Sequence, residues 1–194
     1  MITTKDQLKE VTTYEENMYC KYMFPTRRRQ FMAHIKAEPV YLIMKWQRLS
    51  RFTDYYYSES HKPGASLYSK LAYLYYISKR NRWTRKLGLE IGTENIGKGL
   101  LIYHSAGGIV VNGSSVIGKN CHLHGNNCIG NSGPEDNLCP VIGDDVMLGV
   151  GAKVIGNVCV ANKVKIAAGA VVVKDVLEEG CTVAGVPAKI VKHV

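Results

Sequence analysis

The sequence predicts a mainly β fold, a parallel β-helix made of six-residue repeats, which a small α-helical segment precedes. From residue 96 onward, apolar residues recur every six positions within each run, and small or apolar residues follow four positions later. Neither an α-helix nor an alternating strand has this period, whereas hexapeptide repeats are typical of solenoids. So many positions in register disfavour an ordinary β-sandwich with many Val-Gly turns. The expected inward positions are Val111, Ile117, Leu123, Ile129, Ile142, Leu148, Val154, Val160, Ile166 and Val172, and the second column is Val146, Ala152, Val158, Val164 and Ala170.

Composition and charge both change near Lys86. Eleven of the 12 Tyr precede this residue, and 18 of the 19 Gly follow it. Residues 1–86 carry 17 Lys and Arg against 7 Asp and Glu, while residues 87–194 carry 8 against 9. We therefore expect a basic, Tyr-rich helical domain at 1–86 and a β-helix domain at 87–194.

Three helices are expected in the front domain. The first ends before Pro25, and the second begins at Pro39, a residue suited to a first helical turn. A Ser, Pro and Gly loop at 58–64 separates the second from the third, in which Leu67, Leu71, Leu74 and Ile77 have helical spacing. The expected ranges are 5–22, about 39–57, and 66–85.

The repeat is interrupted twice. Nine residues instead of six separate Ile102 from Val111, and a loop at 130–140, rich in Gly, Pro, Asn and acidic residues, separates two later repeats. Loops that leave a rigid scaffold commonly carry function, so we expect the 130–140 loop to influence specificity. A tolerated insertion is the alternative.

Six Cys are present without any C-x-x-C pair, and no secretory signal opens the sequence. Both observations favour a reducing cytoplasm over a disulfide scaffold. No apolar run approaches the roughly 18 residues of a membrane span.

Several sequence blocks resemble a known family. Residues 96–111 read IGKGLLIYHSAGGIVV, residues 141–146 VIGDDV, residues 151–157 GAKVIGN and residues 184–191 AGVPAKIV. Residues 88–194 thereby resemble the serine acetyltransferases among the hexapeptide acyltransferases. The resemblance implies a left-handed β-helix, acetyl-CoA as co-substrate, no metal, and a homotrimer with sites between subunits.

His104 is the general base that the resemblance implies. Histidine suits proton abstraction because its ordinary pKa lies near neutrality. The family has an Asp immediately before this His, where this sequence has Tyr103. Glu90 lies close to the position of a second supporting Asp of the family, so we expect Glu90 to orient His104.

His122 and His124 flank the inward Leu123 and are expected to face outward near the same groove. His124 and Tyr103 are therefore candidates for contacting the acceptor. Three His also suggest zinc, as in the γ-class carbonic anhydrases, which share the solenoid. The spacing of these His does not match that class, so zinc hydration is the minor alternative.

The resemblance also implies the coenzyme contacts. Gly149, Val150, Ala167 and Ala168 match positions that hold the pantetheine arm. Lys174 and Lys189 match basic positions that meet phosphates, as a Lys can do as a point charge. The alternative for either Lys is a solvated surface amine.

The acceptor is where the match fails. Serine acetyltransferases carry Arg-His-Pro in the loop that holds the serine carboxylate, and the same place here reads Asn137-Leu138-Cys139-Pro140. Glu135 and Asp136 in this loop are expected to accept hydrogen bonds from sugar hydroxyls instead. The basic, Tyr-rich front segment also resembles that of acetyltransferases linked to capsule, exopolysaccharide and lipopolysaccharide assembly. This resemblance implies acetyl-CoA-dependent O-acetylation of a sugar in such a surface-polysaccharide precursor as the function. Serine O-acetylation in cysteine biosynthesis and a non-enzymatic scaffold are the alternatives.

The basic front segment leaves three interpretations open. It completes the acceptor site or the trimer, it attracts an anionic membrane surface, or it binds nucleic acid. No nucleic-acid motif supports the third, so no nucleic-acid partner is expected.

Overall fold

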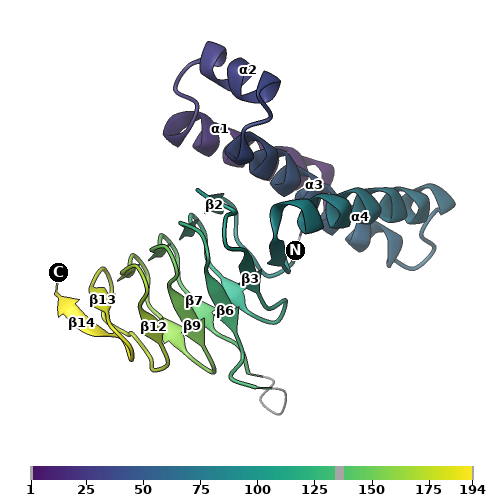
Figure 1. Ribbon diagram of the computed structural model, residues 1–194. Coiled ribbons are helices and arrows are strands. Elements are labelled where there is room, and N and C mark those ends of the chain that lie inside the picture. The colour runs from purple at the N-terminus through teal and green to yellow at the C-terminus, as the bar shows by residue number, and fades with distance from the viewer. Residues whose placement is uncertain (1, 134–137, 194) are drawn as a thin grey trace. The chain divides into compact units, whose positions relative to one another are not determined.

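The computed structural model describes residues 2–133 and 138–193, so Glu135 and Asp136 lie outside the described residues. The chain forms two compact units, residues 1–87 and residues 88–194 (Figure 1). Among the described residues, no helix is long and apolar enough to cross a membrane.

The first unit is helical: α1 (Lys5–Tyr22), α2 (Arg27–Ile35), α3 (Pro39–Ser60) and α4 (Leu67–Leu87). Thr4 caps α1 through a capping box with Gln7, and Pro39 occupies the first turn of α3, where its missing N–H costs nothing. The sequence analysis missed α2, although Thr26 caps it by accepting a hydrogen bond from the backbone N–H of Arg29.

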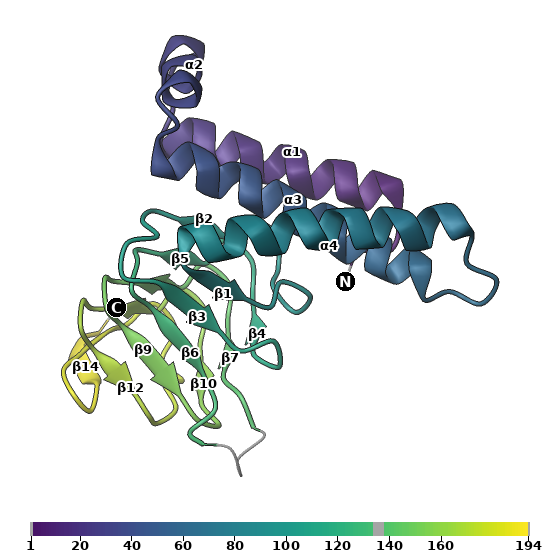
Figure 2. The same cartoon turned by 45° about the vertical axis from the view of Figure 1, so that its right-hand side comes forward.

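Helices α1 and α4 both pack against α3 (Figure 2). Trp46 is fully buried, and its indole N–H donates to Thr84 Oγ1 at 2.8 Å. The rings of Phe52 and Tyr56 both stack on Tyr76 of α4, each with centroids 5.1 Å apart. Aromatic packing and one buried hydrogen bond thus fix α4 along α3.

A buried charged cluster joins α1 to α3. Arg51 makes a bidentate contact with Glu15, the shortest distance being 2.7 Å, and its guanidinium lies 3.8 Å from Asp54. All three side chains are at most 5% exposed. Buried charges are tolerated only when paired, so this cluster fixes the register of the two helices.

The second unit contains three sheets whose strands the chain visits in turn, and the pairs are parallel except β13 with β14. The first sheet contains β1 (Leu89–Ile91), β3 (Ile109–Val111), β6 (Cys128–Gly130), β9 (Lys153–Ile155) and β12 (Val171–Val172). The second contains β4 (Val116–Ile117), β7 (Val141–Ile142) and β10 (Cys159–Val160). The third contains β2 (Leu101–Ile102), β5 (His122–Leu123), β8 (Met147–Leu148), β11 (Lys165–Ile166), β13 (Thr182–Ala184) and β14 (Lys189–Lys192).

The core of this unit is the predicted pair of columns. The ten expected inward residues are each at most 4% exposed, and the five residues of the second column at most 3%. Successive turns place like residues side by side, as in the pairing of Met147 with Lys165 and of Leu148 with Ile166. The six-residue period therefore predicted the buried residues of the unit correctly.

Candidate active site

Two adjacent columns of residues run along the edge of the third sheet, immediately after its short strands. Backbone hydrogen bonds set their register: Tyr103 N–H donates to the Leu123 carbonyl at 2.9 Å, and His124 N–H to the Leu148 carbonyl at 3.1 Å. The pattern continues from Gly149 and Ala167 to the next turns. The first column is Tyr103, His124, Gly149, Ala167 and Ala184, and the second is His104, Gly125, Val150 and Ala168.

His104 is exposed and stands just before a tight turn. Gly107 and Gly108, with φ of 82° and 77°, make this turn, and Gly108 N–H donates to the Ser105 carbonyl at 3.1 Å. This turn accounts for the nine-residue interval between Ile102 and Val111. Because left-handed φ values favour glycine, the two glycines allow the chain to bend sharply beside His104.

The turn below His104 approaches it closely at Gly125. A Cβ on Gly125 would lie 3.0 Å from the carbonyl oxygen of His104 and 3.2 Å from its Cβ. The φ of Gly125, 116°, also disfavours any other residue. Gly125 therefore lets the next turn support the backbone of His104 directly.

Tyr103 contacts both of the other candidate histidines. Its ring stacks on His124, with centroids 4.2 Å apart and an interplanar angle of 12°. Its hydroxyl lies 3.3 Å from Nδ1 of His122. The residue that replaces the family's Asp thus organises a cluster of aromatic and imidazole rings.

The environment favours neutral rings at His122 and His124. Burial lowers the pKa of His124, and the charge of His104 lowers it further. Burial also lowers the pKa of His122, as does His124, while Asp145 acts in the opposite direction. Nε2 of His124 is buried and has no hydrogen-bond partner among the described residues.

Glu90 lies in β1, where it pairs with Val110 and is exposed on the outer face of the first sheet. In the described parts of the chain, no hydrogen bond or ion pair joins it to His104. The orienting role of Glu90 stays a prediction.

The predicted phosphate contacts lie at two different places. Lys189 pairs with Ala184, so it continues the first column at its far end. Lys174 follows β12, at the corner between the first and second sheets. The 130–140 loop leaves β6 at the same corner, so these two elements lie apart from the column that holds His124.

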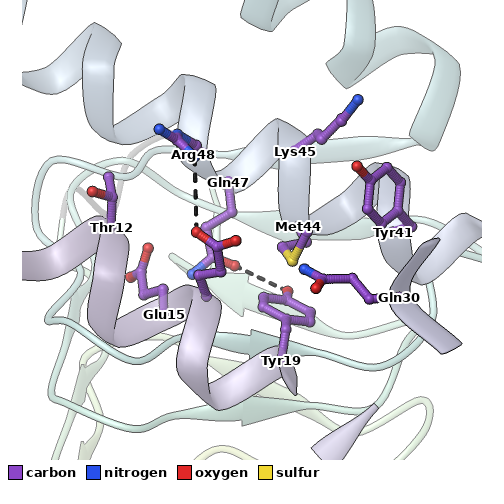
Figure 3. A pocket seen from close by; sticks show the side chains of 10 residues that line it. Thr12, Glu15, Tyr19, Gln30, Tyr41, Met44, Lys45, Gln47 and Arg48 are labelled. Carbon is purple, nitrogen blue, oxygen red and sulfur yellow. Dashed lines mark hydrogen bonds and ion pairs between the residues drawn. The ribbon is translucent and has the colours of Figure 1, made fainter. Parts of the chain in front are cut away.

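Metal ligands are not gathered here: within residues 2–133 and 138–193, no three His, Cys, Asp or Glu side chains are placed to hold a metal ion. The first unit contains a cavity of about 150 Å³ between α1, α2 and α3 (Figure 3). Tyr19 donates there to Gln47 at 3.0 Å, and Arg48 lies 3.8 Å from Glu16. These lining groups bind one another, so the cavity does not compete with the His cluster as the reactive site.

No family model matches the sequence. Curated proteins named serine acetyltransferase do match: one from Staphylococcus aureus strain Mu50 is 35% identical over 137 residues, which is 69% of this chain and 63% of that protein. One from Synechococcus elongatus is 33% identical over 97 residues, 50% of this chain and 39% of that protein. The chain thus spans less than two thirds of the length of these relatives.

Solved structures agree on the fold. Serine acetyltransferase from Neisseria gonorrhoeae matches with a TM-score of 0.70 and 26% identity, over 98% of this chain and 68% of that one. The Brucella abortus enzyme matches with a TM-score of 0.69 and 24% identity, over 98% and 71%. The chain is serine acetyltransferase-like. This serine acetyltransferase-like chain carries its predicted base, His104, beside an edge column of small residues.

Proposed function

We propose that the chain is an acetyl-CoA-dependent O-acetyltransferase with His104 as general base. The observation that carries the proposal is the register at the edge of the third sheet. It aligns the exposed His104 and the partnerless Nε2 of His124 with the small residues of the later turns. The proposed base and the small residues that would hold an extended co-substrate thus lie along the same edge of the third sheet.

His104 takes the proton of the acceptor hydroxyl as the hydroxyl oxygen attacks the thioester carbonyl. The C–S bond then breaks, and the coenzyme thiolate leaves and takes up the proton. Backbone N–H groups at the site stabilise the oxyanion that forms. A neutral His124 lies beside the acceptor, and no covalent acyl-enzyme is needed. Cys139 is a half-buried thiol of the 130–140 loop, and this direct transfer requires no nucleophile from the protein.

The pantetheine arm runs along Gly149, Val150, Ala167 and Ala168. Four strand spacings of about 4.8 Å separate His124 from Lys189, so the strip is about 19 Å long. Its residues are small, and Lys189 supplies a cation at its end. Solved serine acetyltransferases in complex with coenzyme A support acetyl-CoA as the co-substrate.

The relatives favour serine as the acceptor, with O-acetylserine for cysteine biosynthesis as the product. The sugar acceptor that the sequence analysis ranked first is therefore the second candidate. One observation still favours it: Leu138, Cys139 and Pro140 stand in the loop where the family places the residues that hold the serine carboxylate. Without a cation there, a carboxylate has no partner.

The proposal includes a homotrimer of left-handed β-helices in the cytoplasm. Lys174 and the 130–140 loop both follow strands of the first sheet, at one corner of the unit. His104 follows a strand of the third sheet, at another corner. A single site that contains both sets requires two copies of the chain. Six free cysteines without a disulfide suit a reducing compartment.

The test is thioester loss from acetyl-CoA with L-serine and with a panel of sugars in parallel. Saturable turnover with serine supports the first candidate, and turnover only with a sugar supports the second. His104→Ala should lower kcat about 10²–10⁴-fold. His193→Ala, at an exposed histidine on the last turns, is the matched control. Full activity in His104→Ala would exclude His104 as the base.

A further inference from the structure

Helix α4 has apolar residues on two opposite sides, and only one side is packed. Ser69, Tyr76 and Thr84 face α3, as burial, ring stacking and the bond from Trp46 show. Leu67, Leu71 and Leu74 recur at helical spacing on the other side. We call this other side, with the flanking Tyr68 and Tyr75, the α4 stripe.

The α4 stripe is exposed. Leu67 and Tyr68 are each 71% exposed, and the other three residues are 53–59% exposed. Scattered surface hydrophobics are ordinary, but five on one helix face form a contiguous apolar patch. Such patches mark interaction surfaces. The charged residues around the α4 stripe therefore indicate which kind of partner it binds.

The charges of α4 are all positive. The helix carries no Asp or Glu. Arg82 and Arg85 lie on the same side as the leucines, about two and three turns beyond Leu74. Lys70, Lys79 and Lys86 are exposed beside that side. The six cations of the helix are Lys70, Lys79, Arg80, Arg82, Arg85 and Lys86.

We propose that the α4 stripe binds an anionic lipid surface, with Leu67, Leu71 and Leu74 in the acyl boundary and Arg82, Arg85 and Lys86 on the headgroups. Helices that lie on a membrane combine an apolar face with Lys and Arg on the polar positions. Anionic lipids attract such basic clusters within about a Debye length. This proposal concerns the first unit and does not depend on the reaction of the second.

Charge disfavours the other occupants of the stripe. A second copy that met the stripe with its own stripe would bring two purely cationic helices together, and like charges across such an interface oppose association. Nucleic acid would match the cations but not the leucines, because its binding rests on phosphate contacts. A lipid surface offers both an anionic layer and an apolar layer.

Vesicle flotation tests the proposal with the full chain. We expect binding to vesicles of phosphatidylcholine with phosphatidylglycerol, loss of binding at about 1 M salt, and none to phosphatidylcholine alone. The triple variant Arg82→Glu, Arg85→Glu, Lys86→Glu should weaken binding on the order of a hundredfold, since each cation contributes about fivefold. The triple variant Leu67→Ser, Leu71→Ser, Leu74→Ser should weaken it at least about tenfold.

Two control variants match these changes elsewhere in the first unit. Phe31→Ser with Ile35→Ser alters two apolar residues of α2 that are 60% and 62% exposed. Lys5→Glu, Lys9→Glu and Lys21→Glu make the same charge change on α1, where all three are exposed. Both controls should bind within about twofold of the parent chain. Acetyl transfer measured without vesicles should be unchanged in every variant, so a failure here is separate from a failure of the proposed reaction.

Four outcomes would overturn the proposal. One is no binding to anionic vesicles, and another is an equal loss in the α2 or α1 controls. A third is a change of assembly mass in the leucine variant by sedimentation, which would make the stripe a contact between copies. The last is binding to duplex DNA without binding to vesicles. Circular dichroism should show parent-like helix content in each variant, because the altered side chains are exposed.

Discussion

The ring of Tyr103 stacks on the ring of His124, with centroids 4.2 Å apart and an interplanar angle of 12°. The stack follows from register, because Tyr103 and His124 immediately follow neighbouring strands of the third sheet. Side chains side by side on one face of paired strands interact directly. Tyr103 therefore covers one face of the His124 ring, although it occupies the position where the family has an Asp immediately before its catalytic His.

Removing the Tyr103 ring should raise the pKa of His124 toward its ordinary value, because burial is the largest cause of its lowering. Tyr103→Ala removes the stack, whereas Tyr103→Phe keeps it and removes only the hydroxyl near His122. Imidazole NMR titration measures the pKa, with the exposed His193 as internal reference. Equal shifts in the two variants would show that the stack does not bury His124.

Stability should fall as the pH drops below about 6.5, the ordinary pKa of histidine. The pKa values of His122 and His124 are lowered in the folded state. As the pH falls, the unfolded chain therefore binds protons at these residues before the folded chain does, and acid stabilises the unfolded state relative to the folded state. This contribution is fully present above about pH 6.5 and is lost as the pH falls toward the lowered folded pKa values. Urea unfolding of the parent and of His122→Asn with His124→Asn measures it. The variant should show a shallower loss between about pH 7 and pH 5; an identical slope would contradict the assignment.

The buried columns of the second unit could be predicted because every turn repeats the same local environment. Val154 and Ala152, for example, are fully buried as their places in the period require. Local pattern and tertiary position coincide in such a repeat. The sheet register then follows, since a six-residue period fixes which residues of successive turns become neighbours.

Sequence could not predict which face of a helix is covered. The spacing of Leu67, Leu71 and Leu74 correctly predicted α4, but these residues are exposed, because the packing side is set by Trp46 and Phe52 on another helix. Helix α2 was missed for a related reason. Its three successive arginines indicated a charged segment, and the cap at Thr26 was overlooked.

The side-chain contacts within the candidate site could not be predicted from the sequence either. Alternation around Leu123 predicted that His122 and His124 face outward, as they do, but not that Tyr103 contacts both. Contacts across neighbouring turns depend on register, and the irregular nine-residue interval after Ile102 obscured it. The pairing of Glu90 with His104 stays a prediction.

Gly149→Ala should lower the free energy of unfolding by about 1–3 kcal/mol, because a Cβ there would lie 2.6 Å from the backbone nitrogen of Ala168. The turns must separate at the strip proposed to hold the pantetheine arm, so acetyl-CoA affinity should fall as well. Gly133→Ala adds the same atom where no atom of the described residues lies within 4 Å, and should change stability by no more than about 0.5 kcal/mol. Urea unfolding and equilibrium binding measure the two effects. Equal stability of the two variants would contradict the tight packing.

Two arginines of α3 should differ sharply when each is replaced by methionine. Arg51 is paired with Glu15 and both side chains are at most 5% exposed, so Arg51→Met leaves buried carboxylates without their cation and should cost about 3–5 kcal/mol of unfolding free energy. Arg48 lies 3.8 Å from Glu16 in a pair whose side chains are 61% and 47% exposed, so Arg48→Met should cost at most about 1 kcal/mol. Chemical denaturation of both variants gives the comparison, and circular dichroism follows the helices. A small loss in Arg51→Met would mean that solvent reaches Glu15 and Asp54 once the guanidinium is gone. Apolar packing such as that of Leu8 with Tyr55, rather than this ion cluster, would then hold α1 on α3.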